Sequence, residues 1–209
     1  MNCTLCCTHL DSTDIIEDKY FHCPACKGVV KDVSTYLSPE AEKSRYLLHN
    51  NDINDEGYQN FTAPVSDYII RHYLPSHKGL DYGCGKASVI SHRLRSNLYT
   101  VSCYDPYFFP DESVLQESYD YIICSEVAEH FYQPAAEFKK LNQLLNPNGR
   151  LILMTLLYND QINFSTWHYR SDPTHVFFYS EDTIEFICRM FNFKKLLLKG
   201  RLIVLKKEV

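Results

Sequence analysis

The sequence predicts an α/β protein whose doubly wound, mostly parallel sheet ends in an antiparallel hairpin, preceded by a small cysteine-rich unit. Three observations lead to this prediction. Strand-like and helix-like segments alternate from residue 80 onward, which is typical of a parallel sheet with crossover helices. Residues 150–157, RLILMTLL, form a near-continuous apolar run, as expected for a parallel strand covered on both faces. Two apolar runs meet at Lys199 and Gly200, which predicts the closing hairpin.

Length and charge limit the functions that the chain can have. Its 209 residues suffice for one full domain and a small appendage. The net charge of −5 disfavours a general nucleic-acid binder, because such proteins are usually basic. No run approaches the roughly 18 consecutive apolar residues that a membrane span needs. Residues 1–14 lack the basic and apolar regions of a secretory signal, so we expect a cytoplasmic protein with no membrane contact.

Five of the nine cysteines lie within the first 26 residues, and their spacing predicts a metal site. Two C-x2-C pairs separated by sixteen residues fit a zinc ribbon over residues 1–36. The expected ligands are Cys3, Cys6, Cys23 and Cys26. A closed four-thiolate site has no open position for a substrate, so the predicted zinc is structural. The alternative is a set of reduced, reactive thiols, and Cys7, His9 and His22 are spare ligands.

Residues 37–75 are expected to form a helical linker and a lid. A Ser-Pro-Glu sequence is typical of the start of a first helix. Residues 62–74 are expected to form a second helix that begins at Thr62 and Pro64. The lid candidates are Tyr58 and His49.

Residues 80–88, LDYGCGKAS, contain a Gly-x-Gly loop between a predicted strand and a predicted helix. The next strand, residues 98–105, ends at Asp105, twenty positions after Gly85. At that spacing an acidic residue reaches the ribose of a nucleotide in a doubly wound fold. The loop alone would fit a tight turn equally well, but this context favours a nucleotide cofactor.

The rest of the domain continues the alternation. We expect a buried strand ending in a polar cluster (118–131), a helix (133–145), a turn (146–149), a strand (150–157), a capped helix (180–191) and the hairpin. Only fourteen residues separate Asp105 from Asp120, which leaves room for little more than a short edge strand.

Four motifs follow one another along this domain: LDYGCGKAS, SCYDPY, YDYIICSEVAEHF and LLNPNGRLILMT. In this order they resemble the motifs of class I S-adenosylmethionine-dependent methyltransferases, over about residues 60–207. That family more often has Pro-Gly-Gly where this chain has Pro147-Asn148-Gly149. The terminal hairpin and the Asp-x-Gly-x-Gly loop separate the family from nicotinamide oxidoreductases. The resemblance implies a Rossmann-like domain over residues 76–209 that binds S-adenosylmethionine.

The resemblance also implies which residues contact the cofactor. They are Asp81, Tyr82, Gly83, Cys84, Gly85, Asp105, Pro106 and Glu126. Asp81 would accept a hydrogen bond from the ammonium group, and Asp105 would bind both ribose hydroxyls. The glycines would allow the backbone to approach the cofactor, because a Cβ atom would collide with it. Phe108 or Phe109 could stack on the adenine or belong to the core.

Glu126, Glu129 and His130 follow a predicted strand and are expected to lie beside the sulfonium of the cofactor. The Glu-x-x-Glu-His cluster resembles ubiquinone-pathway O-methyltransferases and small-RNA terminal 2′-O-methyltransferases. In the latter group such residues and a later histidine hold Mg²⁺, and that histidine here would be His175 or His168. Glu129 and His130 are therefore catalytic candidates. Alternatively, Glu126 only holds the cofactor while the other two cap the next helix.

Residues 165–180, STWHYRSDPTHVFFYS, are expected to line the acceptor pocket, because they follow a strand that ends at the ligand side of the sheet. His175 is the first candidate for a general base and His168 the second, since the pKa of imidazole suits that role. Arg170 could bind an anionic acceptor. Alternatively, the segment is a packed loop in which His175 is a satisfied core histidine.

The leading interpretation is a cytoplasmic methyltransferase with a zinc ribbon and a small-molecule acceptor. An RNA acceptor is the first alternative, but residues 1–36 carry three lysines against five acidic residues, which disfavours it. The second is a non-catalytic module that binds the cofactor or a partner protein, and the intact glycine loop and Asp105 count against it. The third is a nicotinamide oxidoreductase, which the closing hairpin disfavours.

Overall fold

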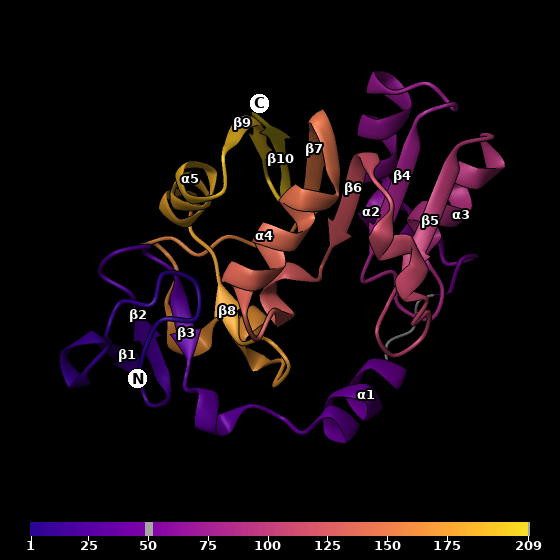
Figure 1. Ribbon diagram of the computed structural model, residues 1–209. Helices are drawn as coiled ribbons and strands as arrows, with labels where there is room; N and C mark the ends of the chain where they lie inside the picture. Colours follow the sequence, from indigo (N-terminus) through magenta and orange to yellow (C-terminus); the bar gives the residue numbers. More distant parts are fainter. Residues whose placement is uncertain (49–51, 209) are drawn as a thin grey trace.

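The computed structural model describes residues 1–48 and 52–208. Figure 1 shows a six-stranded sheet with the strand order β5-β4-β6-β7-β10-β9 and a four-stranded sheet with the order β1-β2-β3-β8. None of the described helices has the length and apolar character that a membrane crossing requires.

The six-stranded sheet confirms the predicted α/β fold. Its strands are β4 (Lys78–Tyr82), β5 (Thr100–Tyr104), β6 (Tyr119–Ser125), β7 (Leu145–Met154), β9 (Phe193–Lys199) and β10 (Leu202–Lys207). β5, β4, β6 and β7 are parallel, and β10 joins β7 in antiparallel register. The β9–β10 hairpin turns at Gly200, where a φ of +59° requires the left-handed conformation that glycine tolerates.

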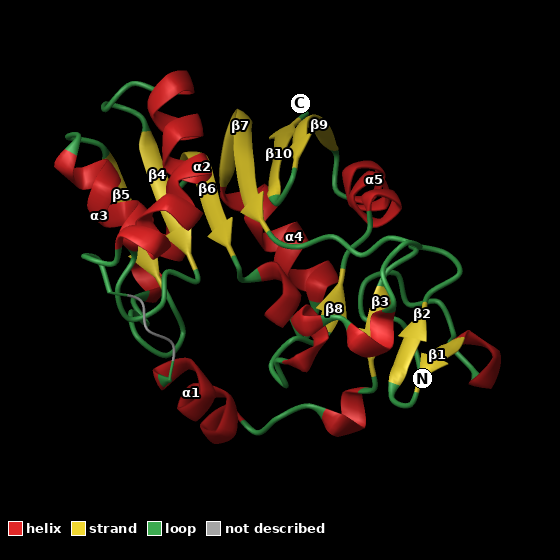
Figure 2. Cartoon of the chain, turned by 180° about the vertical axis from the view of Figure 1, so that it is seen from behind, coloured by secondary structure: helices red, strands yellow, loops and turns green. Residues whose placement is uncertain are grey.

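Helices cover both faces of this sheet (Figure 2). They are α2 (Glu56–His72), α3 (Val89–Ser96), α4 (Pro134–Leu144) and α5 (Glu181–Met190), whereas α1 (Pro39–Leu47) lies below the carboxyl ends of the strands. α2 and α3 pack with Ile123 and Ile152, whereas α4 and α5 pack with their chain neighbours Ile122 and Leu151. Because successive strand residues point to opposite faces, a sheet covered on both sides needs continuous apolar strands.

Serine caps begin three of the predicted helices. The Ser38 side chain accepts a hydrogen bond from the backbone of Ala41 at the start of α1, and the Ser88 side chain accepts one from the backbone of Ser91 at the start of α3. The Ser180 side chain accepts from the backbone of Thr183 at the start of α5, and the Thr183 hydroxyl accepts from the backbone amide of Ser180. These arrangements satisfy amide groups that a helix start leaves without intrahelical partners.

The predicted start of the second helix was wrong. α2 begins at Glu56, six positions before Thr62, after the cap Asp55, whose side chain accepts from the backbone of Tyr58. Pro64 therefore lies inside the helix rather than at its start. The proline leaves the carbonyl of Asn60 without its usual donor, and this is tolerated because Asn60 and Pro64 are exposed to solvent.

The connection between β5 and β6 also differs from the expected short edge strand. Residues 106–118 contain the short 3-10 helix Glu112–Gln116 and a single bridge between Asp105 and Phe109. The Asp105 carboxylate accepts hydrogen bonds from the backbone of Tyr107 and Phe108, which turns the chain back immediately after β5. β5 is consequently the edge of the sheet.

The cysteine-rich unit forms the smaller sheet together with a distant segment. Its strands are β1 (Ile15–Glu17), β2 (Tyr20–His22), β3 (Val29–Lys31) and β8 (Phe177–Phe178). β8 belongs to the segment after β7 and pairs antiparallel with β3, as Figure 1 shows. Gly28 packs against the ring of Phe177, and a Cβ atom at Gly28 would lie 2.4 Å from a ring carbon. The two parts are thus joined by a strand pair that local sequence patterns did not predict.

Candidate functional site

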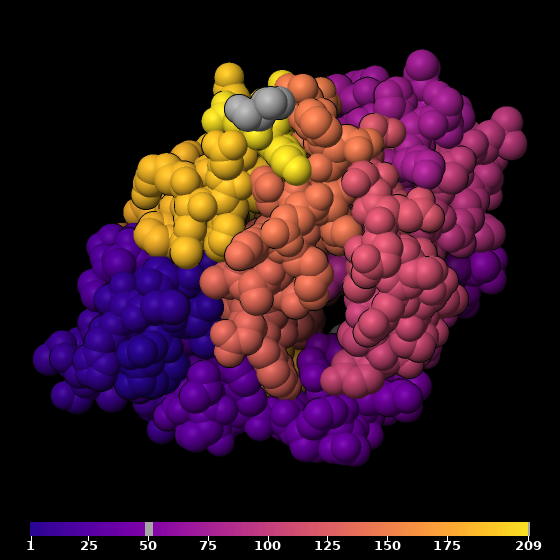
Figure 3. Space-filling model, in the orientation of Figure 1, coloured from indigo at the N-terminus to yellow at the C-terminus, as the bar shows by residue number. Residues whose placement is uncertain are grey.

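A cavity of about 820 Å³ lies at the carboxyl ends of β4, β5 and β6. The glycine loop after β4 forms one wall, residues 125–133 after β6 form another, and side chains of α1 and α2 contribute a third. Figure 3 shows the surface hollowed between the β5 region and the α4 region, above α1. In an open α/β sheet this edge is the usual position for a ligand.

The glycine loop is held in a conformation that suits close approach of a ligand. Gly83 and Gly85 have φ values of +78° and +63°. The backbone amides of Gly83 and Cys84 both donate to the carbonyl of Tyr104. A Cβ atom on Gly83 would lie 2.6 Å from both methyl carbons of Val127. The loop therefore needs glycine for conformation and for space, and it leaves a cradle that fits the proposed cofactor.

Asp81 lies beneath this loop, lines the cavity and is 3% exposed. Its carboxylate accepts hydrogen bonds from the hydroxyls of Ser88 and Ser91, the second at 2.6 Å. Burial raises the pKa of Asp81, although the two serine hydroxyls oppose this effect. Tyr82 and Cys84 also line the cavity.

Asp105 occupies the position at which the sequence predicts a ribose ligand. Its Oδ2 accepts from the backbone of Gly85 at 3.0 Å, and its Oδ1 accepts from the backbone of Tyr107 and Phe108. Pro106 and Phe108 line the cavity, whereas Asp105 does not and is 7% exposed. Asp105 thus fixes the glycine loop, a role that the sequence analysis missed. The other candidate for an adenine contact, Phe109, lies outside the cavity and is 42% exposed.

Glu126 lines the cavity, and its charge is balanced by a residue of the closing hairpin. The Arg201 guanidinium donates to both carboxylate oxygens, at 3.0 and 2.9 Å. Burial and the neighbouring Glu129 carboxylate raise the pKa of Glu126, and Arg201 opposes that rise. Nothing in the local sequence around Glu126 indicates this partner, which lies 75 positions away.

Glu129, His130 and His175 also line the cavity and lie close together. Each offers one ligand atom, and the three atoms lie within 4.8 Å of one another. Glu129 is fully buried and accepts from the hydroxyl groups of Tyr169 at 2.5 Å and Thr155 at 3.0 Å.

Two backbone carbonyls orient the two imidazole rings. The Nδ1 of His130 lies 3.1 Å from the carbonyl of Thr174, and the Nδ1 of His175 lies 2.5 Å from that of Tyr169. A carbonyl can only accept, so each Nδ1 carries the proton and each Nε2 carries the lone pair. Burial lowers the pKa of His175 to about 4, below the imidazole pKa for which the sequence favoured it as a base, so that this ring is neutral at pH 7.

Two predicted residues, His168 and Arg170, are not brought into this group. His168 is exposed and does not line the cavity. Arg170 pairs with Glu17 of the cysteine-rich unit at 2.9 Å and lies over the ring of Tyr20, which leaves it unsuited to bind an anionic acceptor. The lid candidate His49 lies outside the described residues, whereas Tyr58 lines the cavity from α2.

Side chains of α1 that the sequence analysis did not single out also line the cavity. Glu42 accepts hydrogen bonds from the hydroxyls of Tyr46 at 2.7 Å and Tyr107 at 2.6 Å. Tyr46 follows Glu42 by one helical turn, and this spacing was the only available signal. The contact with Tyr107 holds α1 against the segment after β5.

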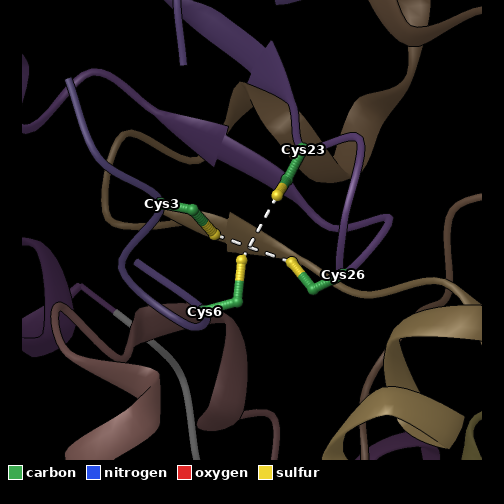
Figure 4. Close-up of side chains that lie close together, drawn as sticks. All are labelled: Cys3, Cys6, Cys23 and Cys26. Atoms are coloured by element: carbon green, nitrogen blue, oxygen red, sulfur yellow. Dashed lines mark hydrogen bonds between the residues drawn. The ribbon is translucent and has the colours of Figure 1, made fainter. Parts of the chain in front are cut away.

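The four predicted zinc ligands lie close together and point toward one another (Figure 4). Their sulfur atoms are separated by 3.6 Å between Cys3 and Cys26 and by 3.4 Å between Cys6 and Cys23. Tetrahedral zinc with Zn–S bonds of about 2.3 Å would separate its sulfurs by about 3.8 Å. The donor set therefore fits a structural zinc ion.

The two cysteine pairs have the same backbone arrangement. Cys7 and Lys27 each follow the second cysteine of a pair, and both have positive φ values, +62° and +60°. Each donates its amide to the carbonyl of the first cysteine in its pair, Cys3 or Cys23. Two equivalent knuckles thus aim four sulfurs at one point.

Comparison with known proteins identifies the family of the chain. The family model described as "Methyltransferase domain" matches residues 30–198. The chain belongs to this family. It is a class I S-adenosylmethionine-dependent methyltransferase, as its motifs predict. No curated protein matches the sequence.

Several solved methyltransferases share the fold. One is the 1,6-didemethyltoxoflavin-N1-methyltransferase of Burkholderia thailandensis, solved with bound 1,6-didemethyltoxoflavin and S-adenosylhomocysteine (TM-score 0.60, 13% identity, 92% of this chain and 100% of that chain). Another is a methyltransferase of Methanosarcina mazei (TM-score 0.52, 14% identity, 68% and 97%). A third is the magnesium protoporphyrin IX methyltransferase of Synechocystis PCC 6803 (TM-score 0.50, 16% identity, 82% and 95%). At these identities the likeness concerns the fold alone.

Replacing Gly83 with alanine is expected to weaken cofactor binding by at least about tenfold. The left-handed conformation alone costs about 1–2 kcal/mol for a residue with a Cβ atom. The contact with Val127 adds to this cost. The matched control is Gly200→Ala, because Gly200 is also left-handed but has no atom within 4 Å of a built Cβ. Calorimetric titration of S-adenosylmethionine into both variants measures the effect, and equal affinities for the two would contradict it.

Proposed function

We propose that this methyltransferase transfers a methyl group from S-adenosylmethionine to a small molecule bound in the cavity beside Glu129, His130 and His175. The observation that carries the proposal is that one cavity is lined both by the glycine loop and by a cluster of two oriented imidazoles and a buried carboxylate. The cofactor would lie along the glycine loop and the acceptor along the cluster.

The residues around the glycine loop would hold the cofactor. Gly83 and Gly85 let the backbone approach its amino-acid tail, and Asp81 is available to its ammonium group. Asp105 would use its remaining lone pairs for the ribose hydroxyls while it holds the loop. The bound cofactor would supply an electrophilic methyl group attached to a sulfonium. The carboxylate of Glu126, which lines the cavity, would face that sulfonium.

His175 would accept the proton that the acceptor loses. Its Nε2 carries a lone pair because the carbonyl of Tyr169 holds the proton on Nδ1. The bound cofactor would supply the methyl group, and the proton that the acceptor loses would move to Nε2 of His175. The buried Glu129 carboxylate lies close enough to stabilise the resulting imidazolium.

A small molecule suits the cavity better than RNA does. The cavity is bounded by α1 and aromatic side chains, among them Tyr46, Tyr107 and Phe108. Its charged lining includes five carboxylates, namely those of Glu42, Asp81, Glu126, Glu129 and Glu137, against the ammonium groups of Lys86 and Lys140. Phosphate groups would be repelled by this excess of negative charge. Two of the structural relatives are named as methyltransferases of 1,6-didemethyltoxoflavin and of magnesium protoporphyrin IX, which are small molecules.

We further propose that Cys3, Cys6, Cys23 and Cys26 bind one structural zinc ion. The support is the sulfur geometry, together with the shortness of strands β1, β2 and β3, at three residues each. Such short strands bury little apolar surface, so a metal would supply much of the stability of the ribbon.

A second candidate role for Glu129, His130 and His175 is to hold a divalent metal ion at the acceptor. Their convergence and the carbonyls behind both rings are typical of metal-binding histidines. The Mg²⁺ set expected from the sequence included Glu126, but Arg201 already neutralises that carboxylate. Two imidazoles and one carboxylate favour zinc, manganese or iron over Mg²⁺. A bound metal would polarise an acceptor hydroxyl, and the three residues would then act as its ligands.

The variant His175→Gln separates these two roles. We expect S-adenosylmethionine to bind it within about twofold of wild type, and methyl transfer to fall by about 10²–10⁴-fold, because the proton acceptor is lost. Transfer of a labelled methyl group to separated small-molecule and RNA fractions measures the activity. Metal analysis of the same samples distinguishes the two roles. One metal ion per chain in both proteins, the ribbon zinc, supports His175 as the general base. Two ions in wild type and one in the variant support a second metal site at Glu129, His130 and His175. Label appearing in RNA alone would overturn the small-molecule proposal.

A further inference from the structure

Residues 173–176, which follow the turn at Asp172, orient both imidazoles of the acceptor side. The carbonyl of Thr174 fixes the Nδ1 of His130, and His175 is the next residue. This segment lies between a 3-10 helix that ends at Ser171 and the two-residue strand β8, and it belongs to neither. Its geometry therefore depends on contacts with other parts of the chain.

Lys31 of the ribbon contacts this segment on both sides of His175. Its Nζ donates to the carbonyl of Pro173 at 2.6 Å, and its backbone amide donates to the carbonyl of Val176 at 2.9 Å. The two accepting carbonyls bracket Thr174 and His175. The β3–β8 pairing begins immediately afterwards, with Val30 opposite Phe177.

Lys31 is almost completely buried. The residue is only 2% exposed, although lysine is among the residues least often buried. Burying an ammonium group is costly unless it is hydrogen-bonded or paired, and an apolar side chain of similar length would avoid this cost. Burial lowers the pKa of Lys31, while the Asp172 carboxylate opposes that effect. The hydrogen bond to Pro173 is the feature that an apolar side chain could not supply.

We infer that Lys31 is a positioning residue for the acceptor side of the active site, holding residues 173–176 so that His130 and His175 face the cavity. The inference rests on the proposed function in one respect, namely that these imidazoles act on the acceptor. It makes the ribbon part of the catalytic architecture, because a ribbon residue sets the orientation of side chains in the methyltransferase domain. Lys31 itself does not line the cavity and contacts no reacting atom.

The test compares Lys31→Met with Lys27→Met in the metal-loaded, full-length protein. Methionine has a similar length and volume but no donor, so the first change removes the bond to Pro173. Lys27 lies in the same ribbon with an exposed side chain, so its replacement removes the same charge without this contact. The readouts are the imidazole nitrogen signals of His130 and His175, assigned with His130→Gln and His175→Gln, and the exchange of the Val176 amide, which donates to the carbonyl of Glu129.

Lys31→Met is expected to shift both imidazole signals and to speed exchange of the Val176 amide by about ten- to a hundredfold, the effect of losing one charged hydrogen bond. S-adenosylmethionine affinity should stay within about twofold, and Lys27→Met should change neither readout. A lower melting temperature with unchanged imidazole signals and unchanged exchange would overturn the inference, since Lys31 would then serve stability alone. Failure of the wild-type protein to bind S-adenosylmethionine would instead count against the proposed function. The imidazole signals and the exchange of the Val176 amide would still show whether Lys31 positions residues 173–176.

Discussion

Replacing Cys26 with serine is expected to remove the ribbon metal and to disorder the acceptor side of the cavity, while cofactor binding persists. Cys26 is buried and supplies one of the four converging sulfurs. Serine is a poor zinc ligand, so we expect the metal content to fall from about one ion per chain to almost none. Structural zinc contributes about 10–16 kcal/mol of binding free energy in isolated zinc-finger peptides, which is far more than three short strands could replace.

The effect should reach the active site through the contacts between the ribbon and residues 165–180. β3 pairs with β8, Glu17 pairs with Arg170, and the hydroxyl of Ser180 donates to the carbonyl of Lys27. The glycine loop instead rests on β4 and β5, which lie in the larger sheet. Loss of the ribbon should therefore disorder the residues on the acceptor side of the cavity and leave the glycine loop on the cofactor side in place.

Hydrogen exchange measured along the chain checks this expectation. Amides of β8 should exchange at least about a hundredfold faster in Cys26→Ser, which corresponds to about 3 kcal/mol of lost local stability. Amides of β4 should be little affected, and S-adenosylmethionine should bind within about threefold of wild type. Cys7→Ser is the matched control, because Cys7 is exposed and lies outside the four-sulfur group. Unchanged exchange of the β8 amides after metal loss would contradict this expectation. So would a loss of S-adenosylmethionine affinity as large as the increase in β8 exchange.

The parts of the molecule that the sequence predicted correctly depend on neighbours in the chain. The glycine loop, the cap at Ser180 and the hairpin at Gly200 each arise from a few adjacent residues with a definite conformational preference. The continuous apolar runs of β6 and β7 follow from burial on both faces of one sheet. These patterns leave a local trace in the sequence, so the α/β fold could be read from it.

The parts that were missed depend on partners far apart in the chain. Pairing of β3 with β8 joins residues about 150 positions apart, and two-residue strands leave no periodic signal. Arg201, at the turn of the closing hairpin, neutralises Glu126, so Glu126 is no longer a candidate ligand of the Mg²⁺ site expected from the sequence. Arg170 looked free to bind an acceptor, but its partner Glu17 lies in the ribbon. Each case requires the tertiary arrangement before the chemistry can be assigned.

Replacing Asp105 with alanine is expected to weaken S-adenosylmethionine binding by about a hundredfold or more. A single hydrogen bond to a charged group contributes about 1.5–3 kcal/mol, or about ten- to a hundredfold in affinity. The structure adds a second loss, because the carboxylate also accepts the amides of Gly85, Tyr107 and Phe108. Alanine would release the glycine loop from the end of β5 as well as remove the ribose ligand.

Two comparisons separate these contributions in the same calorimetric titration. Asp105→Asn keeps one carbonyl oxygen for a backbone amide but loses the negative charge, so its affinity should lie between those of wild type and Asp105→Ala. Asp111→Ala removes another carboxylate that accepts a backbone amide, that of Ser113, but Asp111 is exposed and outside the main cavity. Its affinity should equal that of wild type. If Asp105→Ala binds as well as Asp111→Ala, the acid after β5 holds neither the loop nor the ribose, and the cofactor must be bound in another way.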